Sequence, residues 1–464
     1  MSNSDSSSMN GQTTVWTTKK FLILNSSMAG LQFGFAIMSS FLSPYLSTQL
    51  QFPNYVATLT WCAGPLCGFF VQPLVGSWSD ATRSNMGRRR PWIIFGAAFL
   101  IFSLLFLGFS YAMGSLVNPE DPTKGTAPFA IIGAFLVNAG LNIMLAPCRA
   151  IVADLVPEKD QEAGSGWSAF MVNFSYFIVN VIFYITSFWV VVGEPEFITL
   201  MEIMTTVACF VIIGVCIPTL KYGTERPLPE LIREGKVSVE NTRGNVFSRI
   251  FRAFRTMPKP FLMTCIVFFF SWAGYFPYMI IATQTFGMNA GTLANSLTSL
   301  AGIIYTPFYN KLAQQKGEKS LYLLSQGIMF IAFFILCFFS DTLAVLYICA
   351  FAIGLNVTTM NAAPFSIIGK SNTSDSGLYA GALNACCVLA QLFIQLVTFI
   401  CEACGWDDPS IVLAAVFSFC ATGSCLLLPG LHDTIAAPAD EEGILLVPSR
   451  EVSEEDNFGD DLHV

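Results

Sequence analysis

Charged side chains are scarce in this sequence of 464 residues, of which only 12% are Asp, Glu, Lys or Arg. Hydrophobic residues make up 54% of the chain and include 43 phenylalanines. A soluble domain cannot bury that much apolar surface, so the composition excludes a soluble globular protein and predicts that lipid surrounds most of the chain. The basic residues lie in short loops rather than on one folded face, which argues against a nucleic-acid partner.

Histidine is almost absent as well, since the two histidines, His432 and His463, both lie near the C-terminus. Most of the 14 cysteines fall inside apolar segments, where they act as small apolar residues. The sequence has no nucleophile motif, no metal-ligand cluster and no phosphate-binding loop. It therefore predicts neither an enzyme nor a metal or other cofactor.

Long apolar segments are what the sequence has instead. About twelve of them have roughly twenty residues, the length that crosses a hydrocarbon core of about 30 Å. The sequence thus predicts an all-α polytopic membrane protein with twelve spans in two six-helix halves. The predicted spans are 21–43, 55–78, 92–117, 128–155, 166–192 and 198–220, followed by 261–284, 291–313, 321–340, 343–369, 378–401 and 409–430.

Polar stretches divide the chain into five parts. Low hydrophobicity at both ends is typical of disordered tails, and a further polar segment separates the two sets of spans. The parts are an N-terminal tail 1–20, a first half 21–221, a central loop 222–260, a second half 261–430 and an acidic tail 431–464.

The distribution of lysine and arginine predicts the orientation. With the N-terminus in the cytoplasm, the inside loops receive the cluster 83–90 and the basic residues of the segment 221–259, whereas the outside loops receive only Lys124. We therefore expect both termini and both charged loops on the cytoplasmic side.

The two halves carry a weak internal repeat. Pro73 precedes Asp80 by seven residues at the end of the second span, and Pro307 precedes Gln314 by seven at the end of the eighth. The fourth span contains "APCRAIV" and the tenth contains "APFSIIG". Two matches in register with a six-plus-six division favour duplicated halves, as in rocker-switch transporters.

Amide side chains form stripes along the first, fourth, fifth and eleventh spans, because intervals of four, seven and eleven residues return to one side of a helix. Lipid cannot satisfy polar groups, so the stripes predict a hydrated path lined by the first, fourth, fifth, tenth and eleventh spans, with the third, sixth, ninth and twelfth facing lipid. Interhelical hydrogen bonding is the alternative for any single amide. The candidate substrate-binding residues are Gln32, Asn138, Asn142, Arg149, Asn173, Asn361, Asn384 and Gln391.

Arg149 is the one strong charge well inside a span, where an arginine costs about 2.5–3.5 kcal/mol at the bilayer centre. We expect it to face water or a partner, and a snorkelling structural arginine is the alternative. A path rich in amides and aromatic rings suits an uncharged polyhydroxylated solute, because amides both donate and accept hydrogen bonds. Trp61, Tyr275 and Tyr278 are candidates to cover the C–H faces of such a solute.

The loop "GSWSDATRSNMGRRRPW" between the second and third spans resembles the signature loop of the major facilitator superfamily. The resemblance implies a gate in which Asp80 and the arginines Arg88, Arg89 and Arg90 tie the inner ends of helices together when the cavity faces outward. Bidentate bonds between a carboxylate and guanidinium groups can form in one state and break in the other. A positive-inside anchor is the alternative role for these arginines.

Several stretches in both halves resemble the plant sucrose–proton symporters and their animal relatives, which implies that family's fold and sugar transport. The matching stretches are "AGLQFGFAIMSSFLSPYL", "WCAGPLCGFFVQPLVGSWSD", "GRRRPW", "APCRAIVADL" and "SWAGYFPY", with weaker matches at "NAAPFSII" and "GLYAGALN".

The departures from this family concern charge. Asn138 stands where the plant proteins carry an aspartate, and Asn54 stands where they carry a histidine. Four further charged positions of the family, after the Phe-Pro pair of the seventh span, are occupied by Ala282, Gln284, Met288 and Asn289. Proton coupling needs a group that titrates between the two membrane faces.

The remaining acids near membrane depth are Asp80, Asp154 and Glu202, and the last two are candidate proton sites. Proton-coupled sucrose transport and uncoupled facilitation of sugars both remain open. Another polar solute, such as a polyol or a nucleoside, and a sugar sensor without transport are further alternatives.

The acidic tail contains Glu441 followed by Leu445 and Leu446, a pattern that resembles an acidic dileucine sorting signal read by cytoplasmic adaptor proteins. This pattern keeps an endosomal or vacuolar membrane open beside the plasma membrane.

Overall fold

The structure is a computed structural model that describes residues 16–52, 60–234, 255, 257–286, 288–370, 376–406 and 409–428. Within these ranges every regular element is a helix, as the apolar segments predict. The tail residues Glu441, Leu445 and Leu446 and the loop residue Asn54 lie outside the described ranges.

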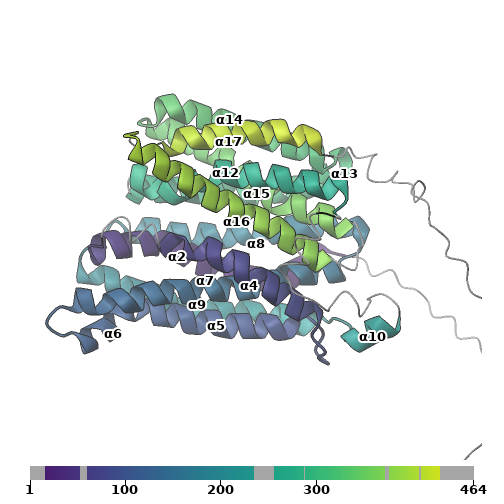
Figure 1. Cartoon of the computed structure of the whole chain (residues 1–464), viewed down its shortest axis with the longest axis horizontal. Coiled ribbons are helices and arrows are strands. Elements are labelled where there is room, and N and C mark those ends of the chain that lie inside the picture. The colour runs from purple at the N-terminus through teal and green to yellow at the C-terminus, as the bar shows by residue number, and fades with distance from the viewer. Residues whose placement is uncertain are drawn as a thin grey trace, which may run out of the picture.

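The helices form two sets that lie one above the other in Figure 1. The first set contains α1 (Thr18–Leu24), α2 (Ser26–Pro44), α4 (Ala63–Asp80), α5 (Arg90–Gly108), α6 (Ser110–Val117), α7 (Pro122–Leu155), α8 (Gln161–Thr186) and α9 (Pro195–Tyr222). The second set contains α12 (Lys259–Thr285), α13 (Met288–Lys316), α14 (Glu318–Phe339), α15 (Leu343–Lys370), α16 (Ser376–Ala403) and α17 (Ser410–Ser424). The short helix α10 (Leu228–Arg233) follows the first set.

Among the described residues, nine helices are long and apolar enough to cross a membrane, and the bent pair formed by α1 and α2 makes a tenth. Helices α4 and α13 occupy the two other predicted spans, but they do not meet the same criterion of length and hydropathy. The predicted span 92–117 is divided at Phe109, where the backbone leaves helical geometry between α5 and α6.

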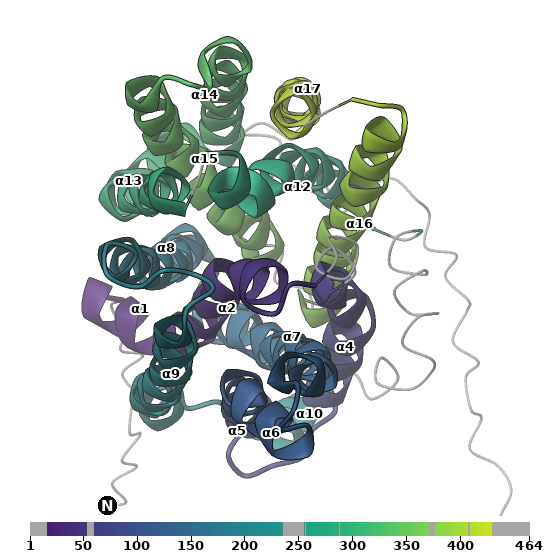
Figure 2. The ribbon, with the colours of Figure 1, turned by 90° about the vertical axis from the view of Figure 1, so that its left-hand side faces the viewer.

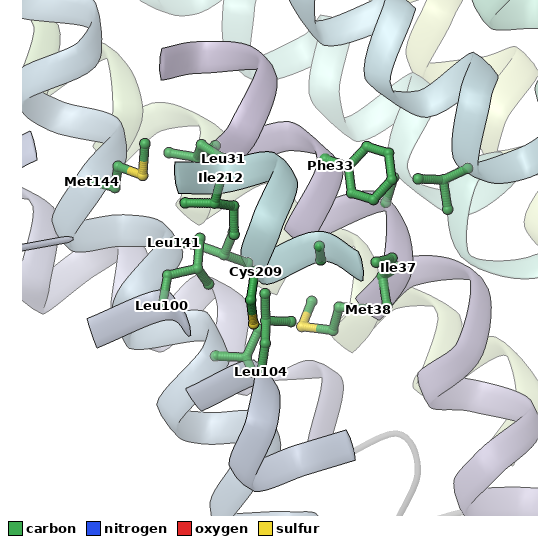
Figure 3. Close-up of a cluster of buried hydrophobic side chains, with 14 of the residues drawn as sticks. Leu31, Phe33, Ile37, Met38, Leu100, Leu104, Leu141, Met144, Cys209 and Ile212 are labelled. Atoms are coloured by element: carbon green, nitrogen blue, oxygen red, sulfur yellow. The ribbon is translucent and has the colours of Figure 1, made fainter. Parts of the chain in front are cut away.

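Each set of helices has its own apolar core. Figure 3 shows part of the first core, where α2, α5, α7 and α9 meet around Leu104 and Leu141. Glycine allows α5 and α7 to approach closely, since a Cβ added to Gly96 would lie 2.8 Å from the Cα of Met144. Small residues at helix contacts suit a membrane protein, because lipid gives no hydrophobic drive for helix association and close packing must supply it.

The two sets meet along two seams, α8 beside α13 and α4 beside α16 (Figure 2), and α8 also packs against α15. Along the first seam Gly166 lies against Asn310, Gly302 lies against Asn173, and the Ser187 hydroxyl donates to Asn289 Oδ1 at 2.7 Å. We call the end of the bundle where α4 ends and α5 begins the charged end. The seams leave a space between them that is enclosed by both sets.

Candidate functional site

A cavity of about 1150 Å³, including space open to solvent, lies between the two sets of helices. Its described lining comes from α2, α4, α7 and α8 of the first set and from α12, α13, α15 and α16 of the second. Five of these helices, α2, α7, α8, α15 and α16, are the spans predicted to border a hydrated path. The other three, α4, α12 and α13, correspond to the second, seventh and eighth predicted spans. None of the described lining residues belongs to α5, α9, α14 or α17, the helices predicted to face lipid.

All eight candidate substrate-binding residues line this one cavity. They come from five helices, and α7 alone supplies three of them, because positions 138, 142 and 149 lie on one face of a helix. The eight residues are Gln32, Asn138, Asn142, Arg149, Asn173, Asn361, Asn384 and Gln391.

Four of the lining asparagines are oriented by their own helices. Asn138, Asn142, Asn173 and Asn361 each donate from Nδ2 to the backbone carbonyl four residues earlier, at 2.8–3.0 Å. These bonds fix the side-chain rotamers and direct the amide groups along the cavity wall. Nδ2 of Asn138 also donates to Met38 Sδ and Nδ2 of Asn173 to Thr358 Oγ1, so these two amides offer the cavity their oxygens as acceptors.

Gln72 is a lining residue that the sequence reasoning missed. Its Nε2 donates to Oδ1 of Asn142 at 2.6 Å, which joins α4 to α7 across the cavity wall. The signal in the sequence was a single amide beside Pro73 in an otherwise apolar stretch of α4, without the repeats that marked the stripes.

Aromatic side chains form much of the remaining wall. Trp61 and Tyr275 line the cavity as predicted, and Trp272, which was not predicted, lies 6.1 Å from Tyr275 between ring centroids. The expectation for Tyr278 is wrong, because this ring is fully buried in the second core against Phe333. Position 278 lies about 60° round the helix from position 275, and its ring packs against Phe333 and does not line the cavity.

Arg149 lies where three cavities adjoin. It lines the main cavity and two smaller ones beyond it. Its guanidinium carbon lies 4.0 Å above the centroid of the Phe365 ring of α15, a cation–π contact between the two sets of helices. Within the described part of the chain, no ion pair joins Arg149 to a carboxylate.

The predicted gate residues form one buried charge cluster at the charged end, the Arg89 cluster. Arg89 is 1% exposed and pairs with Asp80 at 2.6 Å and with Asp154 at 2.8 Å, while Arg88 pairs with Asp154 at 2.9 Å. Burial opposes the charge on Arg89, but Asp154 and Asp80 hold the pKa of this guanidinium above its ordinary range. The cluster therefore joins α4, α7 and the start of α5.

Glu225 extends this cluster towards α9, and the sequence reasoning did not single it out. Its Oε2 accepts from the backbone nitrogens of Arg89 and Arg90 at 2.8 and 3.1 Å, and Arg90 also donates to the Leu220 carbonyl of α9. Burial raises the pKa of the Glu225 carboxyl. Gly87 makes the approach possible, since it has φ +98° and an added Cβ would lie 2.6 Å from Glu225 Cβ.

A second charge cluster at the charged end joins the two sets of helices, and we call it the Lys370 cluster. Lys370 of α15 pairs with Glu162 of α8 at 2.5 Å and with Glu318 of α14 at 2.9 Å, and the Ser366 hydroxyl donates to Glu318 at 2.6 Å. Burial lowers the pKa of Lys370, but Glu318 and Glu162 outweigh it and hold that pKa above its ordinary value. No motif in the sequence singles out Lys370.

The two candidate proton sites lie away from the cavity lining. Asp154 belongs to the Arg89 cluster, and Glu202 lies half-buried on α9. Of the positions that are charged in the sucrose symporters, Ala282 is buried in the second core and Asn289 bonds to Ser187. The side chains of Gln284 and Met288 lie outside the described set. No three His, Cys, Asp or Glu side chains of the described residues are placed to hold a metal ion.

The comparisons with known proteins agree with this architecture. The Major Facilitator Superfamily profile matches residues 24–393. The sucrose transport protein SUC4 of Arabidopsis thaliana is 27% identical over 463 aligned residues, which cover 87% of this chain and 88% of that protein. The sucrose transport protein SUT2 of Oryza sativa subsp. indica is 30% identical over 288 aligned residues, which cover 58% of this chain and 56% of that protein.

Solved structures show the same fold at low sequence identity. The D-xylose–proton symporter superposes with a TM-score of 0.62 at 14% identity and covers 89% of this chain and 99% of its own. The transporter FucP in its outward conformation superposes with a TM-score of 0.57 at 13% identity, covering 88% and 99%. The chain is thus a multi-pass integral membrane transporter and not an enzyme. It belongs to the Major Facilitator Superfamily and, within it, resembles the plant sucrose transport proteins.

Proposed function

We propose that this protein carries sucrose or a related mono- or disaccharide across a membrane by alternating access, with the main cavity as the binding site. The observation that carries the proposal is the gathering of eight predicted polar residues in one cavity between the two halves. Trp61, Trp272 and Tyr275 of the lining supply flat surfaces for the C–H faces of a sugar ring. The names of the relatives support sucrose as the first solute to test.

Transport by this cavity is equilibrative in our proposal. The described lining contains no carboxylate and no histidine, and position 138 carries an amide. The two candidate proton sites for a coupled mechanism, Asp154 and Glu202, lie outside the lining. Because Asp154 contacts two guanidinium groups, a proton on it would weaken the Arg89 cluster as well.

The charged end is cytoplasmic in our proposal, as the positive-inside rule requires, and both chain ends lie on that side. There the Arg89 cluster braces the inner ends of α4, α7 and α9, while the Lys370 cluster holds the two halves together. The membrane is the plasma membrane or an endosomal or vacuolar membrane, and the Glu441, Leu445 and Leu446 pattern is the proposed adaptor signal.

Uptake of labelled sucrose and labelled glucose into proteoliposomes, with and without an inward proton gradient, tests the proposal. We expect both sugars to equilibrate at a rate that is indifferent to the gradient. Accumulation above equilibrium that a protonophore abolishes would contradict the equilibrative mechanism, and Asp154→Asn and Glu202→Gln would then locate the proton site. Uptake of neither sugar would contradict the substrate, and a polyol and a nucleoside are the solutes to try next. Binding without uptake would indicate a sensor.

A further inference from the structure

The main cavity holds a positive charge that the protein does not balance. Arg149 is the only charged residue in the described lining, and no described carboxylate pairs with it. The Phe365 ring faces the guanidinium at 4.0 Å, but an aromatic ring compensates a cation far less than an ion pair does. An uncompensated guanidinium inside a membrane protein is unfavourable, so an anion in the cavity would be stabilised by it.

Two indole donors of the cavity wall also have no hydrogen-bond partner among the described residues. They are the buried indole nitrogens of Trp61 and Trp272. Indole and guanidinium groups donate and cannot accept, so these three residues all seek acceptor atoms. The hydroxyl oxygens of a sugar ring can accept from the indoles, and a carboxylate on that sugar supplies acceptors to the guanidinium.

Amides flank the guanidinium on two sides. Gln72 of α4 and Arg149 both line the main cavity and one of the smaller cavities. Asn361 of α15 and Arg149 both line the main cavity and the other smaller cavity. Asn142 lies seven residues before Arg149 on the same face of α7, a rise of about 10 Å. A sugar ring with a carboxylate on Arg149 therefore lies within reach of amide groups from α4, α7 and α15.

We propose that the cavity binds sugar acids, such as uronates, more tightly than the matching neutral sugars, with the carboxylate on Arg149 and the ring hydroxyls on the flanking amides. This inference rests on the proposed function and narrows its substrate class. The guanidinium fork matches the two carboxylate oxygens in a bidentate pair, and hydrogen bonds to charged groups are roughly twice as strong as neutral ones.

Binding of labelled glucuronate and labelled glucose to the purified full-length protein tests the inference, because the two solutes differ only at one carbon. We expect glucuronate to bind about ten- to a hundred-fold more tightly. Arg149→Gln should remove this preference and leave glucose binding less affected, whereas Arg149→Lys should keep part of it. The matched control is Arg83→Gln, which removes an exposed arginine outside the cavity lining and should keep the full preference.

A second variant guards against a folding defect in Arg149→Gln. Asn138→Asp places a negative charge in the cavity beside a preserved Arg149, so it should weaken glucuronate binding more than glucose binding. Acetate at the same concentration controls for the effect of charge alone. If acetate displaces labelled glucuronate as effectively as unlabelled glucuronate does, the sugar-acid site is overturned. Equal affinities for glucuronate and glucose, or a preference that survives Arg149→Gln, would overturn the inference as well.

The outcomes separate this inference from the proposed function. Transport of glucose and sucrose without preference for glucuronate would leave the proposed function intact and overturn the inference. Binding and uptake of glucuronate but of neither neutral sugar would uphold the inference and contradict the neutral substrates. Binding of none of these solutes would contradict both.

Discussion

The two charge clusters at the charged end have similar parts and different partners. The Arg89 cluster joins α4, α5, α7 and α9, all of which belong to the first set of helices. The Lys370 cluster joins α14 and α15 of the second set to α8 of the first. If the halves rock apart, the Arg89 cluster can move as one piece, whereas the Glu162–Lys370 pair has to break.

The Arg89 cluster is therefore a brace within one half of the molecule, whereas the Lys370 cluster is a latch between the two halves. The signature loop drew attention to Asp80 and the three arginines, yet its described contacts hold a single half in shape. Among the described ion pairs, the one between the halves is made by Lys370, a residue that no motif marked. Because Lys370 keeps Glu318 as a partner when Glu162 leaves, opening costs one pair rather than a whole buried cluster.

Removal of Arg89 should have the largest effect. Arg89→Ala leaves two carboxylates near each other without their shared cation, and breaking a buried pair in this way costs about 3–5 kcal/mol. We expect a marked loss of thermal stability in detergent and a loss of uptake. Arg83→Ala is the control, since it removes an exposed arginine of the same loop. Normal stability of Arg89→Ala with altered transport would show that the cluster acts as a gate and not as a brace.

The matched pair Glu162→Gln and Glu318→Gln tests the latch directly. Each variant removes one carboxylate from Lys370, but only the first weakens the contact between the halves. We expect Glu162→Gln to speed hydrogen–deuterium exchange about three- to ten-fold at the start of α8 and the end of α15. Glu318→Gln should leave the exchange of α8 closer to that of the parent protein. Equal acceleration of α8 in both variants would argue against a latch.

Gly87 tests the geometry of the Arg89 cluster. Alanine there brings a Cβ into contact with Glu225 and disfavours the positive φ, at a cost of about 1–3 kcal/mol. We expect Gly87→Ala to lower the thermal midpoint less than Arg89→Ala does. Gly405 also has a positive φ, but an added Cβ meets nothing within 4 Å, so Gly405→Ala separates the backbone cost from the contact with Glu225. An equal decrease in thermal midpoint in Gly87→Ala and Gly405→Ala would show that the contact with Glu225 does not contribute to the destabilisation.

The smallest expected effect is a pH dependence from Glu225. Burial raises its pKa in the folded protein, so the folded state binds a proton more readily than the unfolded chain. Stability from this residue is therefore present below the ordinary glutamate pKa of 4.5 and declines as the pH rises through the raised value. Glu225→Gln should flatten the fall in thermal midpoint between acidic and neutral pH. An unchanged slope would assign the pH dependence to other groups.

The helical periodicity predicted the cavity better than it predicted the charge contacts. Asn138, Asn142 and Arg149 were found because intervals on one helix fix which residues share a face. The partnership of Lys370 with Glu162 depends on how two distant helices lie side by side, which no interval within one helix encodes. Trp272 and Gln72 lacked a repeat of their own, and Tyr278 failed because an aromatic residue in a span fills a core as readily as it lines a path.

The contacts along α8 and α13 have a mechanical consequence. The two helices touch near the charged end at Gly166, in the middle at Gly302, and at the far end through Ser187 and Asn289. Contacts at three points along α8 and α13 oppose separation of the two helices at either end. The line of contact runs from one mouth of the cavity to the other, so a movement that widens one mouth and narrows the other has to release a contact at one end of this seam.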